Sequence, residues 1–190
     1  MADYVANIAP FINQIFYVTS AFGEQPRNHR GLDIATPTAV GNAPVYSVCN
    51  GTVVFSGAQT DGQGNYTGYG NYIIMKDSVT NMGFLFAHLE RRDVSLGDTV
   101  SIGQQVGLEG MTGEATGIHL HFEMQDLTNH SWQYGQPLSS YENPATFMGI
   151  PNTEGISAIY YGTPIPPTPV QIERNFPWVL FSKKFRNRRI

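Results

Sequence analysis

The chain has 190 residues, of which 41% are hydrophobic and 12% aromatic, so it can bury one sizeable core, and we expect one main domain with terminal extensions. Five of its eleven Lys and Arg residues lie in residues 183–189, which leaves six basic against fifteen acidic residues in residues 1–182. An acidic body with a basic C-terminal end argues against a nucleic-acid-binding domain, although the end itself could contact an anionic partner.

The N-terminal segment, residues 1–15, is expected to form an extension before the domain. It lacks a basic region, and polar residues and proline interrupt its apolar residues, so it does not match a Sec signal peptide. The sequence has no run of about 18 consecutive apolar residues, so we expect no transmembrane segment. The one cysteine, Cys49, cannot form an intramolecular disulfide, and its apolar neighbours favour a buried thiol over a catalytic one.

Short runs of β-branched, aromatic and aliphatic residues predict strands at residues 45–48, 52–55, 72–75, 84–88 and 119–124. No long stretch has the apolar period of about 3.6 residues that marks an amphipathic helix. We therefore predict an all-β domain of short antiparallel strands, with any helices short and peripheral. The glycine-rich residues 57–70 do not match a phosphate-binding loop, and we interpret them as a mobile loop that forms one wall of a site.

Four histidines and one aspartate supply the candidate site. His119 and His121 lie one residue apart in a predicted strand, so both side chains should face the same side of the sheet. A catalytic zinc ion takes three protein ligands and keeps a fourth position open, a count that His29, Asp33 and one histidine of the pair satisfy. Their mixed nitrogen and oxygen donors favour zinc over ions that prefer oxygen alone. The His-Glu-x-x-His motif of many metalloproteases is absent.

These residues lie within an ordered series of segments between residues 19 and 148. The most distinctive are His29-Arg30-Gly31-Leu32-Asp33, Gly68-Tyr69-Gly70-Asn71, Ala87-His88-Leu89, Gly97-Asp98-Thr99-Val100 and His119-Leu120-His121-Phe122-Glu123. In this order they resemble the lysostaphin-type, or LytM-like, zinc metallo-endopeptidases, which cut peptide bonds in bacterial peptidoglycan. The resemblance implies a metallo-endopeptidase domain over residues 16–148, with antiparallel sheets that form a groove.

The resemblance also implies a role for each candidate residue. His29, Asp33 and His121 would bind one Zn²⁺, while His88 and His119 would stay free of the metal and handle protons. We expect His119 to take a proton from the attacking water and to return one to the leaving amine. His88 would orient the water or stabilise the developing oxyanion, although the two roles could be exchanged.

The chain departs from the family pattern at two places. Ile118 stands where relatives usually have proline, and residues 23–28 lack the tyrosine that some members place before the first ligand. Oxyanion stabilisation by such a tyrosine is therefore in doubt. Tyr69, Tyr72 or Arg27 could substitute for it, and the sequence does not choose among them.

Two other classes of protein were weighed. Residues 97–107 resemble the turn region of lipoyl or biotinyl carrier domains, but Lys76 and the two terminal lysines do not lie in the hairpin context that an acceptor lysine needs. A noncatalytic cell-wall-binding or virion structural module on the same fold is the stronger alternative. Such modules usually lack ligands, whereas here the full set is present.

The last segment, residues 149–190, is expected to be an irregular C-terminal extension. Its residues 165–169 have the composition of a stiff proline-rich linker, and residues 176–181 are too apolar for a simple disordered tail.

Because no export signal was recognised, we hypothesise a bacteriophage enzyme that acts on the cell wall, either attached to the phage tail or released at host lysis. The extension would then dock on phage tail proteins. The scissile bond is expected to involve a glycyl or D-alanyl residue.

Overall fold

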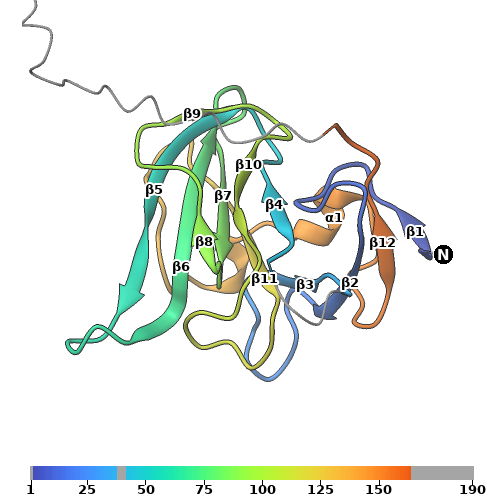
Figure 1. Ribbon diagram of the computed structural model, residues 1–190, viewed down its shortest axis with the longest axis horizontal. Helices are drawn as coiled ribbons and strands as arrows, with labels where there is room; N and C mark the ends of the chain where they lie inside the picture. Colours follow the sequence, from blue (N-terminus) through green and yellow to red (C-terminus); the bar gives the residue numbers. More distant parts are fainter. Residues whose placement is uncertain (1, 38–41, 164–190) are drawn as a thin grey trace, which may run out of the picture.

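The computed structural model describes residues 2–37 and 42–163, and within these residues the protein is built almost entirely from β-strands (Figure 1). One five-residue helix, α1 (Pro144–Met148), and one 3-10 turn at Leu138–Ser140 are the helical elements of the described chain. The prediction of an all-β domain with short, peripheral helices is confirmed. No helix in the described ranges has the length and apolar character needed to cross a membrane.

Nine strands of the described chain form one large sheet. Neighbouring strands are antiparallel, except that the two strands at one edge are parallel. In spatial order the sheet consists of β1 (Tyr4–Val5), β12 (Ser157–Ile159), β2 (Ile15–Ser20), β3 (Leu32–Ala35), β11 (Leu120–Asp126), β7 (Met82–Ala87), β6 (Tyr66–Asp77), β5 (Gly51–Thr60) and β9 (Thr99–Val100). A smaller antiparallel sheet consists of β4 (Pro44–Tyr46), β10 (Gln105–Leu108) and β8 (Arg91–Arg92).

The central strands of the large sheet are buried on both faces. Alternate side chains point to opposite faces, and each face has its own apolar cluster. One face contributes to the main core through Ile73, Met75, Phe84, Phe86 and Phe122. The other face carries a second apolar cluster made by Tyr72, Ile74, Leu85, Ala87, Leu127, Trp132 and Tyr141. His121 and Glu123 pair with Ala87 and Leu85, so they lie on this second face, beside the second cluster.

The glycine-rich residues 57–70 are not the loop that the sequence predicts. β5 and β6 continue through both ends of this segment as a long hairpin, and only residues 61–65 form the connection. The pairing of β5 with β6 is irregular in this segment, with a shift in register between Ala58 and Thr60. Gly70 adopts a positive φ of 59°, and a side chain at this position would collide with the backbone of Thr112. The expectation of a wall beside a site is met, because Gln59 and Tyr69 line the groove described below.

Segments near the two ends of the described chain lie together in the sheet. β1 and β12 pair with each other, and β12 also pairs with β2. Before β12, α1 begins after Asn143, whose side chain accepts a hydrogen bond from the backbone N–H of Ala145, and it is followed by Gly149 in the left-handed conformation. The predicted linker at residues 165–169 and the apolar segment 176–181 lie outside the described residues.

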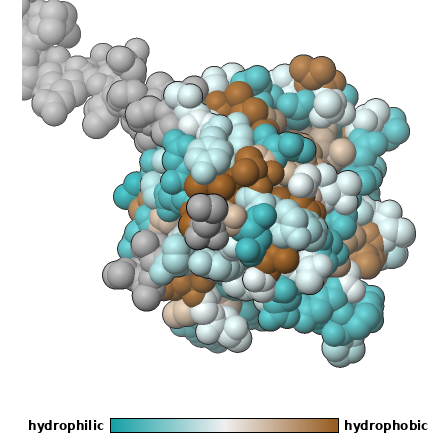
Figure 2. All heavy atoms as spheres, turned by 90° about the vertical axis from the view of Figure 1, so that its right-hand side faces the viewer, coloured by the Kyte–Doolittle hydropathy of each residue, from teal (hydrophilic) through white to brown (hydrophobic). Residues whose placement is uncertain are grey.

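The face that carries β1 and β12 is partly apolar. Figure 2 shows hydrophobic side chains gathered near its middle, with hydrophilic side chains around them. Val5 on β1 is 64% exposed. Because β1 is only two residues long, it offers few unpaired backbone groups at this edge of the sheet.

Candidate metal centre

Two neighbouring strands place an aspartate and a histidine side by side. Asp33 on β3 and His121 on β11 are partners in the antiparallel ladder, so their side chains leave the sheet on the same face. The Nδ1 atom of His121 lies 2.7 Å from Oδ1 of Asp33. Both residues are buried.

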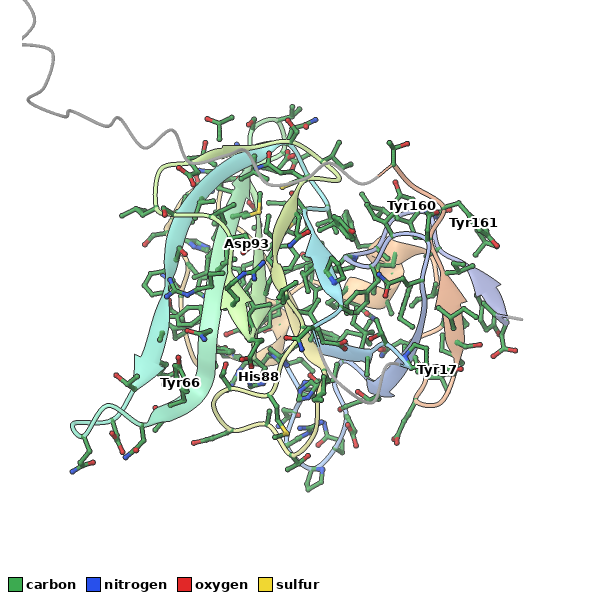
Figure 3. The ribbon with its side chains drawn as sticks, viewed as in Figure 1. Tyr17, Tyr66, His88, Asp93, Tyr160 and Tyr161 are labelled. Carbon is green, nitrogen blue, oxygen red and sulfur yellow. The ribbon has the colours of Figure 1, made fainter. Side chains whose placement is uncertain are left out.

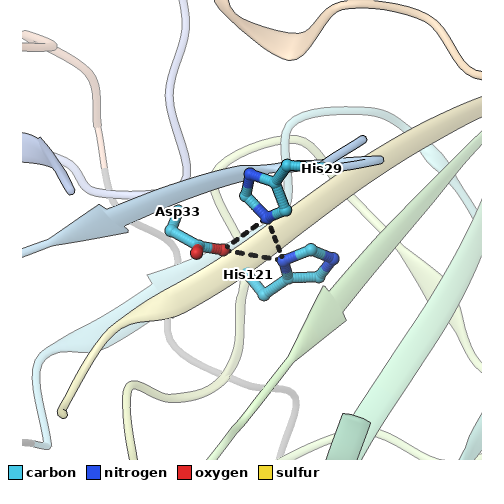
Figure 4. Close-up of side chains that lie close together, drawn as sticks. All are labelled: His29, Asp33 and His121. Atoms are coloured by element: carbon cyan, nitrogen blue, oxygen red, sulfur yellow. Dashed lines mark hydrogen bonds and ion pairs between the residues drawn. The ribbon is translucent and has the colours of Figure 1, made fainter. Parts of the chain in front are cut away.

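His29 joins this pair from the connection between β2 and β3. Its Nε2 atom lies 3.1 Å from Asp33 Oδ1 and 3.1 Å from His121 Nδ1 (Figure 4). One donor atom from each of the three residues therefore lies within 4.8 Å of the other two. Two imidazole nitrogens and one carboxylate oxygen are donors that zinc accepts, so the residues present fit a zinc ion.

Each candidate ligand histidine directs one ring nitrogen at Asp33 and the other at a different oxygen atom. The Nδ1 atom of His29 lies 2.9 Å from the carbonyl oxygen of Ala21, and since a carbonyl can only accept, Nδ1–H is the donor. The Nε2–H of His121 donates to Oε1 of Glu123 at 2.8 Å. A metal ion beside Asp33 would therefore meet Nε2 of His29 and Nδ1 of His121, the two nitrogen atoms that face this carboxylate.

His88 and His119 lie at the border of this group. His88 follows the last residue of β7 (Figure 3), and its Nδ1–H donates to the carbonyl of Thr112 at 2.8 Å. The Nδ1–H of His119 donates to the carbonyl of Gly117, also at 2.8 Å. Each ring therefore keeps Nε2 as a proton acceptor. The two rings are 4.8 Å apart between centroids, and Nε2 of His119 lies 3.7 Å from Asp33 Oδ1.

The backbone of His88 is unusual. Its φ is +60°, in the left-handed region that residues other than glycine rarely adopt. The backbone N–H of His88 donates to the carbonyl of Tyr69, and its side chain is held by Thr112. These two hydrogen bonds hold the His88 backbone in its unfavourable conformation and keep the imidazole ring beside His119.

Burial and charge shift the pKa values of this group in different directions. Burial disfavours the charged form of Asp33, but hydrogen bonds from His121 and His29 outweigh burial and hold the pKa of Asp33 well below its usual range. Burial also opposes a charge on His121, yet its bonds to Asp33 and Glu123 raise its pKa to about 9. Burial, followed by the nearby His121 and His119, lowers the pKa of His88 to about 4, so His88 is neutral at neutral pH.

A groove of about 910 Å³ opens over these residues. Three tyrosines that contact one another, Tyr69, Tyr72 and Tyr134, line it, and the hydroxyls of Tyr72 and Tyr134 are 3.1 Å apart. Arg27, from the segment before His29, also lines the groove. All five sequence-predicted site residues line this groove, so the fold brings them to one place.

The structure distinguishes among the three residues considered as oxyanion stabilisers. The hydroxyl of Tyr69 donates to Glu123 at 2.8 Å, and that of Tyr72 contacts Tyr134. Arg27 lies beside the ligands, with Nη2 3.5 Å from Asp33 Oδ2, and it also contacts Ser20 and Glu24. Of these three, Arg27 has the polar group that approaches a ligand carboxylate directly.

Sequence reasoning missed Glu123 and Tyr134 as residues of this site. Glu123 was part of the histidine-rich segment, and its spacing of two from His121 on a strand was the signal that could have placed it on the same face. Tyr134 lies in the segment after β11 and gives no comparable signal. The fifth histidine, His130, is exposed and does not line the groove. Cys49 is, as predicted, a buried free thiol, and burial raises its pKa to about 12.

Comparisons with known proteins agree with this geometry. The chain is 38% identical over 96 residues to the peptidoglycan DD-endopeptidase ShyA of Vibrio cholerae, a match that covers 50% of this chain and 20% of ShyA. It is 30% identical over 139 residues to the glycyl-glycine endopeptidase ALE-1 of Staphylococcus capitis, covering 72% of this chain and 36% of ALE-1. The chain thus spans well under half the length of either relative.

A solved structure shows the same fold. The catalytic domain of the prophage-encoded M23 protein EnpA from Enterococcus faecalis superposes with a TM-score of 0.56 at 26% identity, covering 74% of this chain and 97% of that domain. The model of peptidase family M23 matches residues 27–136, which include all five predicted site residues and more than half of the chain. The chain therefore belongs to peptidase family M23, the family of the peptidoglycan endopeptidases that it resembles.

Proposed function

We propose that the protein is a zinc-dependent endopeptidase that hydrolyses peptide bonds in bacterial peptidoglycan. One observation carries the proposal: donor atoms of His29, Asp33 and His121 converge within 4.8 Å in an open groove. Two further imidazoles, of His88 and His119, border them, and each directs Nδ1 at a backbone carbonyl. Family membership supports the same reaction class.

His29 Nε2, Asp33 Oδ1 and His121 Nδ1 would hold the zinc ion. When bound, zinc supplies Lewis acidity, which polarises a carbonyl group and makes water a better nucleophile near neutral pH. Water would then be the nucleophile and no serine or cysteine would be needed, in keeping with the buried, high-pKa thiol of Cys49.

The two bordering histidines would move the protons. We assign the general base to His119, because its Nε2 is 3.7 Å from the ligand atom Asp33 Oδ1 and the bond to Gly117 keeps Nδ1 protonated. The proton that Nε2 receives can then pass to the leaving amine. His88, neutral at neutral pH and with Nε2 as an acceptor, would orient the water, and the cationic Arg27 beside Asp33 would stabilise the oxyanion.

The substrate bond is proposed from the relatives. ShyA is named for DD-endopeptidase activity and ALE-1 for cleavage between glycines, so a small D-alanyl or glycyl residue at the scissile bond is consistent with both. Loops on scaffold strands commonly determine such choices, and here Gln59 and Gly68 of the β5–β6 hairpin and part of the segment 110–117 line the groove. The bordering residues Glu114 and Thr116 belong to the second of these segments.

The experiment that tests this function compares three forms of the protein on purified peptidoglycan. Metal-free protein, protein restored with one equivalent of zinc, and restored His119→Ala protein are assayed for release of new amino termini. The proposal predicts release by the zinc-restored wild type alone. Release by metal-free protein would contradict zinc dependence, and equal release by His119→Ala would contradict the assigned base.

A noncatalytic module on the same fold is the alternative. Such a module is expected to lack stoichiometric zinc, so metal analysis of the purified protein separates the two functions. The three ligand residues and both bordering histidines favour the enzyme.

We also propose a phage-encoded role in entry or lysis, which the similarity to the prophage-encoded EnpA supports. Docking on phage tail proteins would use the C-terminal extension, of which residues 164–190 lie outside the described chain. Antibody labelling of purified phage particles tests the tail-associated version, and unlabelled particles would contradict it.

A further inference from the structure

A buried carboxylate supports the candidate metal centre from behind. Glu123 is 2% exposed and follows His121 by two residues on β11, so both side chains leave the same face of the sheet. Its Oε1 atom accepts the hydrogen bond from His121 Nε2 at 2.8 Å. Glu123 therefore contacts the ring nitrogen that is not directed at Asp33.

Tyr69 holds this carboxylate in place. Its hydroxyl donates to the same Oε1 atom of Glu123 at 2.8 Å, and its ring centroid is 5.8 Å from that of His121. Burial, together with the negative charge of Glu123, raises the pKa of Tyr69, so the hydroxyl stays protonated and remains a donor. Tyr69, Glu123 and His121 form a continuous chain of hydrogen bonds.

The second oxygen of the carboxylate is unusual. Among the described residues, Oε2 of Glu123 is buried without a hydrogen-bond partner. A buried carboxylate with an unpaired oxygen is costly in isolation, because desolvation penalises its charge. A divalent cation on the far side of the His121 ring would offset that cost. The buried charge of Glu123 is therefore consistent with a metal ion at this site.

We propose that Glu123, held by Tyr69, is a positioning residue that fixes His121 in the tautomer and orientation presenting Nδ1 to the metal. An imidazole bound to a metal ion is neutral and carries one proton, and a carboxylate that accepts this proton's hydrogen bond at Nε2 leaves the lone pair on Nδ1 for the metal. The negative charge also makes the ring a stronger ligand. This inference rests on the proposed zinc-dependent function and adds the residue that prepares one of its ligands.

Zinc affinity of the full chain tests the proposal without an activity assay. Metal-free wild type, Glu123→Gln and Tyr69→Phe are titrated with zinc against a chelating dye. Glu123→Gln keeps the side-chain shape and removes the charge, and it is expected to weaken zinc binding about 10-fold or more. Tyr69→Phe leaves the carboxylate in place and should weaken binding by a smaller factor.

The matched control is Gln125→Met, which lies two residues further along β11. Gln125 is as buried as Glu123, and its side chain hydrogen-bonds to the backbone of Gln133, away from His121. This variant should lose thermal stability and keep wild-type zinc affinity. The visible spectrum of bound Co²⁺ should change in Glu123→Gln and stay unchanged in Gln125→Met.

Each outcome bears on the proposal. Zinc affinity of Glu123→Gln within twofold of wild type, or an equal loss in Gln125→Met, would overturn the positioning role while leaving the proposed function in place. A folded wild-type protein that binds no zinc would overturn both. Selective loss in Glu123→Gln, with the shifted Co²⁺ spectrum, supports the assignment.

Discussion

At the scale of single residues, each site histidine directs one ring nitrogen at an oxygen atom that holds the ring in place. Carbonyl groups of Ala21, Thr112 and Gly117 accept from the Nδ1 atoms of His29, His88 and His119. Only His121 has its outer nitrogen directed at a carboxylate. The metal-facing nitrogen is therefore Nε2 in one ligand histidine and Nδ1 in the other.

The two histidines of the His119-Leu120-His121 segment are predicted to respond differently to substitution. His121→Ala removes a ligand and should abolish stoichiometric zinc binding. His119→Ala should retain zinc and lose about 100-fold or more in hydrolysis rate, because the proton acceptor is gone. Metal analysis together with rates on one peptidoglycan substrate checks both parts. Equal zinc loss in the two variants would show that the assigned roles are wrong.

Glu109 gives a pH-dependent prediction away from the metal. It is fully buried, and burial raises its pKa above the ordinary value of 4.5 although Thr36 donates hydrogen bonds to both of its oxygens. Because the folded state holds this proton more tightly, Glu109 favours folding below pH 4.5, and that contribution is lost as pH rises through the raised pKa.

Glu109→Gln is neutral at every pH and should escape this loss. The free energy of unfolding of the variant relative to wild type should therefore rise between about pH 4 and about pH 8 in chemical denaturation. Glu154→Gln, at an exposed position, is the control and should show no such trend. A difference that is constant with pH would contradict the raised pKa.

At the scale of elements, the hairpin of β5 and β6 shows how far the sequence could predict the fold. The apolar cores of these strands were predicted correctly near residues 52–55 and 72–75, because β-branched and aromatic residues concentrate there. Their continuation past Gly57 and Gly70 was missed. Hydrogen bonds between the strands and the close approach of Gly70 to Thr112 determine the conformation of that segment. Neither can be predicted from local composition.

The same limit applied to the site. The three candidate ligands and two further histidines were predicted from the residues and their family resemblance, and the structure brings the five side chains into one groove. The links from Glu123 to Tyr69 and from His88 to Thr112 join segments 54 and 24 residues apart. Such contacts depend on the packing of the sheet, and single-sequence patterns do not report them.

Gly70 offers a test at this scale. Gly70→Ala combines a positive φ with a collision against Thr112, so it should lower the free energy of unfolding by about 2 kcal/mol or more. Activity should fall as well, because Thr112 accepts the hydrogen bond from His88. Gly62→Ala, in open space on the same hairpin, should leave stability within about 0.5 kcal/mol of wild type. Thermal unfolding of both variants is the measurement, and equal melting temperatures would refute the account of this segment.

At the scale of the whole molecule, the metal site connects parts of the chain that are far apart in sequence. His29 and Asp33 lie more than 80 residues before His121, and β3 and β11 meet in the middle of the large sheet. Metal binding at this point should therefore stabilise the folded protein as a unit. A ligand present at 100 times its dissociation constant contributes about 2.7 kcal/mol to the free energy of unfolding.

Zinc is accordingly predicted to raise the melting temperature of the metal-free protein by about 5–10 °C. The His121→Ala variant should show no such rise under the same conditions, because one buried ligand is missing. Differential scanning calorimetry with and without zinc gives both values. A comparable rise in the variant would place the stabilising ion elsewhere.

The most direct test of the account is mass spectrometry of peptides released from purified peptidoglycan of several cross-link types, with His119→Ala as the control. We predict that the wild-type protein releases fragments with new termini at a glycyl or D-alanyl residue, and that the variant releases none above background. Zinc-loaded wild-type protein that releases no peptide from any wall type would contradict the proposed endopeptidase.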